Sequence, residues 1–378
     1  MRFATLLKNP ADWMEAKNID NSIVVSSRVR LARNVSGYAF PGWSEKKQRV
    51  ELTDKICQSL ETLGVMKNGF SHEFSDLSQL QKQVLVERHL ISRELAARGE
   101  GAAAVIDRKQ RISIMVNEED HLRMQSIYAG LNIKKAYKVL SKVDTDLETK
   151  LTFAFDKDLG YITACPTNLG TGMRASAMLH LPGLSMSGQL SKVLNGISKI
   201  GLAVRGIFGE GTESIGYLFQ ISNQSTLGES EESIIDRLDT VLYQVMQHEQ
   251  NAREKNLQDN SQKVIDEIGR SYGLLKYSHL MDSKEAYKHV SIVRLGAATG
   301  FFDPNIIKAC DNWLLDIQPA HLQLHAKKEL DSNERDFIRA EILRDKLQNV
   351  DSPSTNYKRP SKKTNQSDDT PSLFEDYE

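Results

Sequence analysis

Residues 102–117, AAAVIDRKQRISIMVN, contain the pattern that decides the fold. Two apolar runs, Ala102 to Asp107 and Arg111 to Asn117, are separated only by the polar tripeptide at 108–110. Apolar runs of this length around a short polar link are typical of a β-hairpin. Because a hairpin joins antiparallel strands, this stretch predicts an antiparallel sheet.

The same pattern recurs twice after this hairpin. A second hairpin is expected at 151–164 and a third strand pair at 202–208 and 217–222, while residues 23–25 predict a short strand. Helices are expected at 45–64 and 133–150, which gives an α+β domain with an antiparallel sheet and helices on one side. From about residue 229 to 347 the pattern is helical, and residues 351–378 have the composition of a disordered tail.

The total charge is close to zero, but its distribution is uneven. The 378 residues include 49 Lys+Arg and 50 Asp+Glu. Residues 21–44 contain no acid but three arginines, and residues 159–209 contain no acid but two arginines and two lysines. Acid-free stretches with spaced arginines predict a local anion site inside a neutral protein.

Several classes of protein are disfavoured by the sequence. Cys57, Cys165 and Cys310 form no CxxC pair, so neither a disulfide framework nor a protein-held metal is expected, and the cytoplasm is the expected compartment. No apolar run approaches the roughly 20 residues of a membrane span. Residues 170–175 formally fit a dinucleotide-binding fingerprint at the start of an expected helix, but the acid that should follow about 20 residues later is missing.

Five dispersed arginines remain as candidates for binding phosphate, because a guanidinium contacts two phosphate oxygens at once. Taken singly, each is more often a solvated or salt-bridged residue. The three adjacent acids at 118–120 follow an expected strand, and their structural alternative is an ordinary helix N-terminus. Glu210 could equally be a turn carboxylate, and Cys165 a small buried side chain.

The string Cys165 to Gly172, CPTNLGTG, resembles the signature of the phosphagen (guanidino) kinases. Four further strings resemble that family's remaining active-site strings in family order: SRVR at 27–30, NEEDHLR at 117–123, RAS at 174–176 and RGIFGE at 205–210. The resemblance covers about residues 23–254. It implies an antiparallel sheet flanked by helices, an ATP substrate, and Mg²⁺ held mainly by phosphates.

The layout of the chain narrows this resemblance to one branch of the family. Creatine and arginine kinases carry a helical domain before the SRVR string, whereas here that string begins at residue 27 and helices follow the catalytic part. Together with the strings VLVERHLIS at 84–92 and RDFIRA at 335–340, this resembles the bacterial branch that phosphorylates arginine in proteins. The implied domains are a catalytic domain at 1–254, a helical phosphoarginine-binding and dimerisation domain at 255–350, and the tail at 351–378.

The resemblance also implies roles for individual residues. Glu119 and Glu210 would hold the target guanidinium, with Glu119 the better candidate for the base and Cys165 close by. The motif at 335–340 would bind phosphoarginine as an allosteric activator, although a plain Asp336–Arg339 pair on a helix is the structural alternative. The ATP-binding residues would be Ser26, Ser27, Arg28, Val29, Arg30, His89, Arg123, Arg174, Ala175, Ser176, Ala177, Met178, Arg205, Gly206, Ile207, Phe208, Gly209 and Glu210.

The implied activity is transfer of the ATP γ-phosphate to arginine side chains of proteins, which would mark them for Clp-type degradation and control stress-response repressors. The alternatives are a kinase for free arginine or another small guanidino compound, and a catalytically silent regulator that binds phosphoarginine or nucleic acid. Implied partners are protein substrates, a zinc-containing activator (McsA-like), Clp protease components and a second copy of the chain. Neither a membrane nor a nucleic acid is an expected direct partner.

Overall fold

The computed structural model describes residues 1–8, 11–14, 22–208 and 214–354, and these form two compact units that do not follow chain order. The first unit comprises residues 1–178, 221–239 and 318–328, and the second comprises 179–220, 240–317 and 329 onward. Three elements pass from one unit to the other: β8 (Met173–His180), β10 (Ser214–Asn223) and α8 (Glu231–Asp259).

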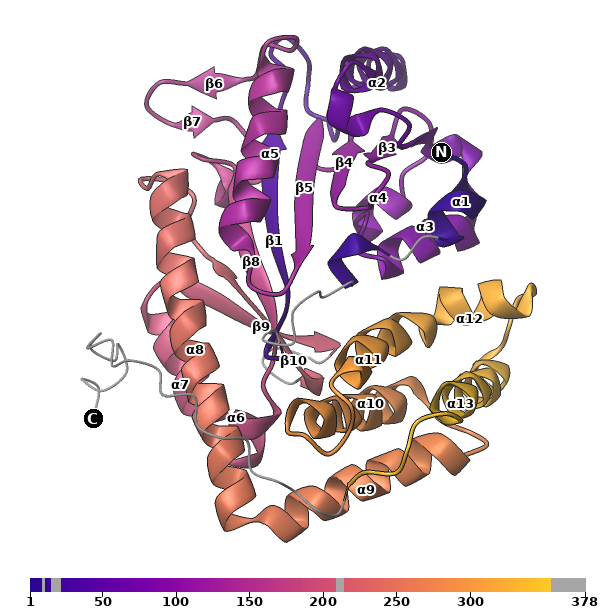
Figure 1. The fold of residues 1–378 in the computed structure, drawn as a ribbon. Helices are drawn as coiled ribbons and strands as arrows, with labels where there is room; N and C mark the ends of the chain where they lie inside the picture. The colour runs from indigo at the N-terminus through magenta and orange to yellow at the C-terminus, as the bar shows by residue number, and fades with distance from the viewer. Residues whose placement is uncertain (9–10, 15–21, 209–213, 355–378) are drawn as a thin grey trace. The chain divides into compact units, whose positions relative to one another are not determined.

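The first unit holds most of the sheet (Figure 1). Its elements are α1 (Phe3–Lys8), β1 (Val24–Arg33), α2 (Lys46–Glu61), β2 (Phe70–Glu73), α3 (Gln79–Glu87), α4 (Arg93–Ala96), β3 (Ala103–Ile106), β4 (Ile112–Val116), β5 (Leu122–Ala129), α5 (Ile133–Glu148), β6 (Phe155–Asp156), β7 (Gly160–Tyr161) and α12 (Pro319–Ala326). A short 3₁₀ turn, Pro166–Asn168, precedes β8.

The main sheet has eight strands in the order β2-β3-β4-β5-β1-β8-β10-β9. The predicted hairpin at 102–117 is confirmed, since β3 pairs antiparallel with β4 and places Ala104 opposite Met115. β4 then pairs with β5 and β5 with β1, all antiparallel. The predicted α+β class with an antiparallel sheet flanked by helices is therefore confirmed.

Helices lie on both faces of this sheet rather than on the one side that was expected. α5 packs against β1 and β5. On the other face, side chains of β3 and β4 join an apolar cluster with α1, α3 and α4, as Met115 does with Leu6, Leu85 and Leu95. Both faces of the antiparallel sheet are thus buried in this unit, which explains the near-continuous burial of β3 and β4.

Three local predictions need correction. The expected short strand at 23–25 continues to Arg33. Successive side chains of β1 point to opposite faces of the sheet, and residues on both faces are buried. The hairpin at 151–164 is reduced to two residues a strand, β6 and β7, which form a separate small sheet. Residues 173–180 form strand β8 and not a helix.

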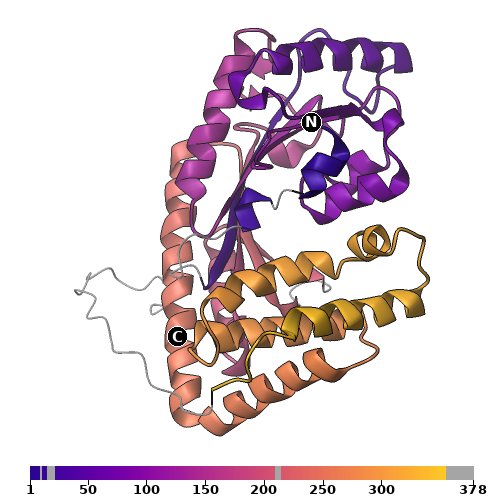
Figure 2. The same ribbon diagram turned by 45° about the vertical axis from the view of Figure 1, so that its right-hand side comes forward.

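The second unit is mostly helical (Figure 2). Its elements are α6 (Pro182–Met186), α7 (Leu190–Lys199), β9 (Leu202–Phe208), α9 (Ser261–Tyr277), α10 (Ser283–Ala298), α11 (Asn305–Asp316) and α13 (Ser332–Leu347). Apolar side chains of α9, α10, α11 and α13 form its core. The predicted helical pattern from about residue 229 to 347 is confirmed.

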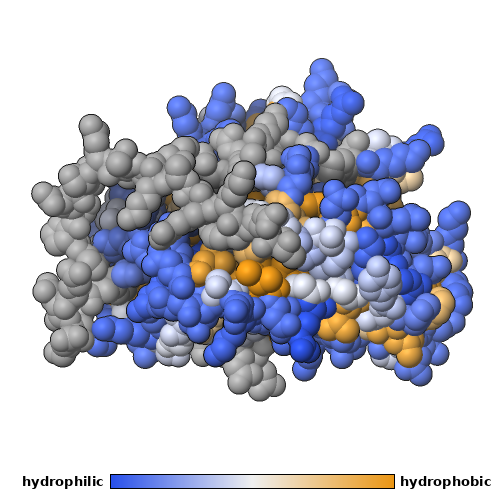
Figure 3. All heavy atoms as spheres, turned by 60° about the horizontal axis from the view of Figure 1, so that its bottom comes forward, coloured by the Kyte–Doolittle hydropathy of each residue, from blue (hydrophilic) through white to orange (hydrophobic). Residues whose placement is uncertain are grey.

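Some large apolar side chains of the second unit remain exposed. Figure 3 shows one face of the molecule, on which apolar residues interrupt a hydrophilic surface. The exposed large apolar residues in this unit are Tyr243, Leu274, Tyr277, Leu280 and Phe337. Among the described residues, no helix combines the length and apolar character needed to cross a bilayer.

Candidate active site

Three neighbouring strands of the first unit deliver four arginines to the same part of the sheet. Arg28 and Arg30 are two residues apart on β1 and therefore face the same side. Arg123 of β5 lies opposite Ala32 in the register, which places it on that same face. Arg174 lies on β8, the neighbour of β1 on its other side.

These arginines are close enough to repel one another. Burial, then Arg123 and Arg174, lower the pKa of Arg28 to about 10. Burial, then Arg28, Arg123 and Arg174, lower the pKa of Arg30 well below its usual value. The buried Nε of Arg30 has no hydrogen-bond partner within the described part of the chain. We call these four residues the arginine cluster; a polyanion would relieve its repulsion and supply acceptors for its donors.

Glu118 is a carboxylate that faces this cluster. Its Oε1 accepts from Arg123 Nη1 at 2.5 Å and also from the Ser92 hydroxyl, while its backbone carbonyl accepts from Arg98. Burial acts to raise the pKa of Glu118, but the hydrogen bond and charge of Arg123 outweigh it, so the pKa lies below its usual value. Glu118 therefore stays ionised and fixes the Arg123 side chain.

The three adjacent acids lie in the β4–β5 connection and not at a helix N-terminus. Asp120 is buried and accepts from Asn34 Nδ2 and from the Ala164 amide, each at 2.6 Å. These contacts hold the loop that carries Cys165 beside the exposed Glu119. The Cys165 thiol is close enough to the Glu119 carboxylate to lower its pKa, and its Sγ lies 3.0 Å from Thr167 Oγ1.

The electrostatic environment of Glu119 suits proton transfer. Partial burial, then the charges of Asp120 and Glu118, raise the pKa of Glu119 above its usual value, against the opposing effects of Arg123 and Cys165. A carboxylate with a raised pKa is a stronger base. Sequence reasoning identified Glu119 and Cys165 but gave no role to Glu118 or Asp120; their burial depends on tertiary contacts that the sequence does not display.

His89 follows the last turn of α3 in a left-handed conformation, with φ of 57°. Its carbonyl accepts from Gln125 Nε2 at 2.6 Å, and Gln125 is the register partner of Arg30. Burial, then Arg28, lower the pKa of His89 to about 4. The imidazole is therefore neutral at neutral pH and lies near the arginine cluster.

Strand alternation divides the remaining residues of the predicted ATP-binding strings. The side chains on the face of the cluster are those of Ser26, Ser176 and Met178. Those on the opposite face are Ser27, Val29, Ala175 and Ala177, all buried. The Ser27 hydroxyl donates to the Gly130 carbonyl at 2.7 Å and accepts from the Asn132 amide at 3.0 Å. On this opposite face the side chains are part of the fold's interior.

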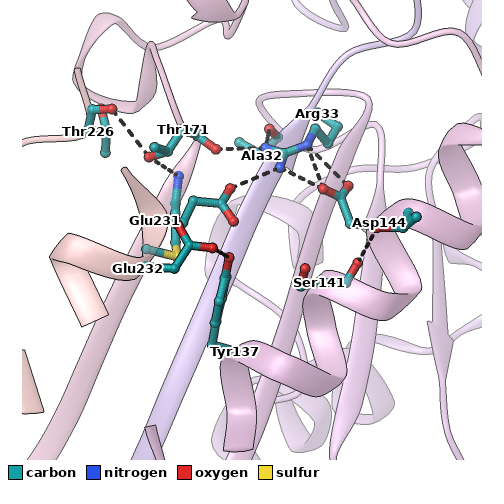
Figure 4. A network of polar contacts seen from close by, with 11 residues as sticks. Ala32, Arg33, Tyr137, Ser141, Asp144, Thr171, Thr226, Glu231 and Glu232 are labelled. Atoms are coloured by element: carbon teal, nitrogen blue, oxygen red, sulfur yellow. Dashed lines mark hydrogen bonds and ion pairs between the residues drawn. The ribbon is translucent and has the colours of Figure 1, made fainter. Parts of the chain in front are cut away.

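Arg33 lies on β1 as well, yet strand alternation places it on the face opposite to the cluster. Figure 4 shows its guanidinium directed at Asp144 of α5. Its Nε and Nη2 bind Asp144 of α5, Nη1 donates to the Thr171 carbonyl at 2.9 Å, and Nη2 reaches Glu231 at 3.5 Å. The guanidinium also stacks 3.4 Å from the ring centroid of Tyr161. Arg33 therefore fixes the residues that lead into β8 and Arg174.

The glycine string before β8 is explained by this arrangement. Gly172 has φ of +62°, and a Cβ there would lie 2.6 Å from the Ala32 carbonyl oxygen and 2.7 Å from Arg33 Nη1. Only glycine fits without displacing the Arg33 guanidinium. Because a strand and not a helix follows, the string also lacks the helix N-terminus that a dinucleotide fingerprint requires.

Other predicted site residues belong to the second unit or lie outside the described residues. Arg205 is an exposed residue of β9 in the second unit, followed on that strand by Gly206, Ile207 and Phe208. Gly209 and Glu210 lie outside the described residues. No placement relative to the cluster is therefore assigned to this string.

The motif at 335–340 lies on α13 of the second unit. Arg339 is buried and donates to Asp336 Oδ1 at 2.5 Å, to the Met281 carbonyl at 2.8 Å and to the Ile317 carbonyl at 3.2 Å. Arg335 is partly exposed and donates to the Leu330 carbonyl at 2.7 Å. Of the other members, Phe337 is exposed, Ile338 half-buried and Ala340 buried. The structural alternative, an Asp336–Arg339 pair, is present.

Comparison with known proteins defines the class first. Residues 51–252 match the family model of the ATP:guanido phosphotransferase C-terminal catalytic domain. Among solved structures, the substrate-free duplicated taurocyamine kinase from Schistosoma mansoni is similar, with a TM-score of 0.56 and 29% identity. That similarity covers 68% of this chain and 37% of the other.

The helical part and the curated relatives narrow the class. Residues 261–358 match the family model of the protein-arginine kinase McsB C-terminal domain. The protein-arginine kinase of Halothermothrix orenii is 41% identical over 90% of this chain and 97% of its own length. That of Shouchella clausii is 42% identical over 92% of this chain and 98% of its own length. The chain thus belongs to the protein-arginine kinases, ATP-dependent phosphotransferases that act on arginine.

Proposed function

We propose that the arginine cluster binds the ATP phosphates and that the Glu119–Cys165 pair receives an arginine side chain of a protein. The observation that carries this proposal is the juxtaposition of four buried or half-buried arginines with repelling charges and an exposed carboxylate, Glu119, that has the Cys165 thiol beside it. The first set suits a polyanion and the second a cation. A phosphotransferase acting on a guanidinium needs both.

The guanidinium is a poor nucleophile, because its pKa lies above about 12 and its lone pairs are delocalised. In the proposed step a guanidinium nitrogen attacks the γ-phosphorus, the N–P bond forms and the bond to the ADP oxygen breaks. The guanidinium proton passes to the Glu119 carboxylate. Glu210 would be a second carboxylate that holds the guanidinium, and the Cys165 thiolate would add a negative charge close to Glu119.

The phosphoryl group in transfer carries its charge on three equatorial oxygens, which fixed cations stabilise. We assign this task to the arginine cluster together with Arg205. The residues fit a polyphosphate, since the buried Nε of Arg30 is a donor with no acceptor in the described ranges of the chain. Bound Mg²⁺, held mainly by phosphates and water, would neutralise further phosphate charge. Strand alternation supports side-chain contacts from Ser26, Ser176 and Met178, with only backbone contacts from their strand neighbours.

For the helical part we propose the domain limits 255–350, after a catalytic domain at 1–254 and before a tail at 351–378. The motif at 335–340 would bind phosphoarginine as an activator. The exposed apolar residues of α9 and its C-terminal loop, Leu274, Tyr277 and Leu280, support a homodimer formed through this part. From family membership alone we further propose a cytoplasmic location, an McsA-like zinc-containing activator, Clp protease components and stress-response repressors as partners.

The experiment that tests this function compares two acceptors. The protein is incubated with ATP and Mg²⁺ and either an unfolded, arginine-rich protein or free arginine, and phosphoarginine is measured by mass spectrometry at neutral pH. We expect phosphorylated arginine in the protein acceptor and much less product from the free amino acid. Product from free arginine alone would support a kinase for small guanidino compounds instead. No product from either acceptor would support a catalytically silent regulator.

A further inference from the structure

Trp43 has the largest exposed fraction among the large apolar side chains of the described ranges, at 88%. It lies in the first unit, in the connection between β1 and α2. We call residues 36–44 of this connection the aromatic loop, because it also contains the half-buried Tyr38 and Phe40. The rings of these two residues each lie 6.4 Å from the ring of His121. Single apolar residues are common on protein surfaces, so exposure alone does not define a binding surface.

The position of the loop beside the proposed substrate site is the second observation. Residues 117–121, which we call the acid turn, join β4 to β5 and carry Glu119. A backbone hydrogen bond of 3.0 Å between the first and last residues closes this turn. The last residue, His121, binds the aromatic loop. Its Nδ1 accepts from the Val35 amide at 3.0 Å, so Nε2 carries the proton and donates to the Ala39 carbonyl at 2.9 Å.

The other end of the aromatic loop is connected to the first residue of the acid turn. The carbonyl of Ser44, which follows Trp43, accepts from Arg49 Nη1 at 2.5 Å. The carbonyl of Arg49 in turn accepts from Asn117 Nδ2 at 3.1 Å. Along the chain, Trp43 therefore lies between two points at which the loop is connected to the acid turn. These contacts order the loop before any substrate arrives, which lowers the entropic cost of binding.

Phe155 of β6 is another exposed aromatic residue of the first unit, with an exposed fraction of 60%. Its ring packs on the Tyr161 ring with a centroid distance of 5.2 Å, and Tyr161 in turn stacks on the Arg33 guanidinium. Phe155 is thus linked to the face of β1 opposite to the arginine cluster. The acid turn, by contrast, contacts the cluster through Glu118. Phe155 therefore provides a matched comparison for Trp43.

A protein substrate brings more than a guanidinium to the site. Its arginine belongs to a polypeptide, so the residues beside that arginine must lie against the surface around Glu119. The exposed residues next to Cys165 are Pro166 and Thr167, which are small. The aromatic loop instead presents an indole, which offers a large apolar contact area with few rotatable bonds. An exposed carboxylate and a nearby indole suit an arginine with an apolar neighbour.

We propose that the aromatic loop binds the polypeptide beside the target arginine, and that Trp43 packs against an aromatic or branched aliphatic side chain of that polypeptide. The loop thereby favours arginines that have an apolar neighbour in the substrate sequence. This inference rests on the proposed function, because it takes Glu119 as the place of the target guanidinium.

The first test measures kcat/KM of the full-length protein for two peptides of equal length, each with one central arginine. In one peptide Phe and Leu flank the arginine, and in the other Gly and Ser flank it. We expect the wild type to prefer the apolar peptide. W43A should lower kcat/KM for that peptide by about 10-fold, through KM, and leave the Gly/Ser peptide unchanged. A tenfold change corresponds to about 1.4 kcal/mol, of the order expected for burying one large apolar side chain.

Two further variants show whether the effect belongs to the indole. W43F should keep most of the preference for the apolar peptide, because phenylalanine retains an aromatic face. F155A removes an exposed aromatic side chain of the same unit and should behave as the wild type. The KM for ATP should be unchanged in all three variants, and thermal unfolding confirms that each is folded.

The second test measures peptide binding without catalysis, by tryptophan fluorescence in the absence of ATP. Of the three tryptophans, Trp13 and Trp313 are each only 5% exposed, so acrylamide quenches mainly Trp43. The apolar peptide should protect Trp43 from acrylamide and shift its emission to shorter wavelengths. The Gly/Ser peptide should have a much smaller effect, and W43F should lose both signals.

Wild-type kinetics in W43A, an equal loss in F155A, or Trp43 fluorescence that does not respond to the apolar peptide would overturn the proposal. If both peptides were still phosphorylated, such results would leave the proposed function intact. A wild-type protein that phosphorylates neither peptide, but in which the apolar peptide protects Trp43, would refute the proposed function and retain the docking surface.

Discussion

The two faces of strand β1 use the same residue type in opposite ways. Arg28 and Arg30 face a cluster in which arginines repel one another and the Nε of Arg30 has no partner among the described residues. Arg33, three residues after Arg30, faces α5 and binds Asp144, two carbonyls, Glu231 and the Tyr161 ring. One face has surplus positive charge, and the other has its charge fully matched.

This difference separates an arginine that binds a ligand from one that builds the fold. A buried arginine that is paired with a carboxylate is important for the stability of the folded state. If the arginine is replaced by an uncharged residue, the carboxylate remains buried without a partner. A mismatched cluster destabilises the folded state until an anion arrives. Replacing one residue of each kind by the same side chain should therefore give opposite patterns in activity and stability.

The largest expected effect is that of R30M on catalysis. Because Arg30 would stabilise the charge of the transferring phosphoryl group, kcat/KM should fall by about 10³- to 10⁵-fold, the range for an arginine at a phosphoryl group. Stability should be unchanged or higher, since one repelling charge is gone. Steady-state kinetics and thermal unfolding of the same preparation check both halves. If R30M lost stability along with activity, Arg30 would have a structural role like that of Arg33.

R33M should show the reverse pattern. Breaking a buried ion pair typically costs about 3–5 kcal/mol, and here Arg33 and Asp144 have side-chain exposed fractions of 1% and 11%. The free energy of unfolding should fall by that order, as measured by urea denaturation of wild type and variant. The folded fraction should retain ATP binding. If R33M unfolded like the wild type, the network around Asp144 would not be a structural one.

E119Q should remove the proposed base while leaving ATP binding largely intact. The loss of a general base typically costs about 10²- to 10⁴-fold. In the wild type, activity should fall as the pH drops through the pKa of Glu119, and this limb should lie above the ordinary glutamate range because burial, Asp120 and Glu118 raise that pKa. The limb should be absent from the residual activity of E119Q. Wild-type turnover by this variant would refute the assignment.

The smallest expected effect is that of C165S. A serine can still donate to Glu119 but cannot supply a thiolate. The guanidinium therefore loses one contact with a charged group, and the rate should fall by roughly 10- to 100-fold. Stability should not change, because Cys165 is half-buried and the Thr163 hydroxyl donates to its backbone carbonyl, which a serine keeps. Pre-steady-state rates at saturating ATP provide the measurement. An unchanged rate would remove the thiol from the mechanism.

The sequence predicted those elements whose pattern is local. The hairpin at 102–117 and the helices at 45–64 and 133–150 follow from periodicity within the segment, and they are present as β3–β4, α2 and α5. The failure at 173–180 has a physical reason. The glycines before it imitate a helix-opening loop, whereas Gly172 is required by the close approach of Ala32 and Arg33 from another strand.

The site was predictable in part for the same reason. The arginines were found from missing acids and matching strings, but the acid-free stretch at 21–44 also includes Arg33, which serves the fold. Strand alternation along β1 could have distinguished Arg33 from the other two arginines. Arg28 and Arg30 are two positions apart and share a face, whereas Arg33 is three positions after Arg30 and points to the opposite face. The carboxylate of Glu87 in α3 accepts a hydrogen bond from the Ala320 amide at the start of α12. These two residues are 233 positions apart in sequence, so no local pattern signals the contact.

The central claim is that the mismatched face of β1 binds ATP and the matched face does not. Thermal unfolding with and without ATP, for wild type, R30M and R33M, tests it most directly. At an ATP concentration one hundred times the dissociation constant, bound ligand adds about 2.7 kcal/mol to stability. We predict that ATP raises the unfolding temperature of the wild type and of R33M, and leaves that of R30M unchanged. An equal rise in R30M and the wild type, or its loss in R33M alone, would contradict the account.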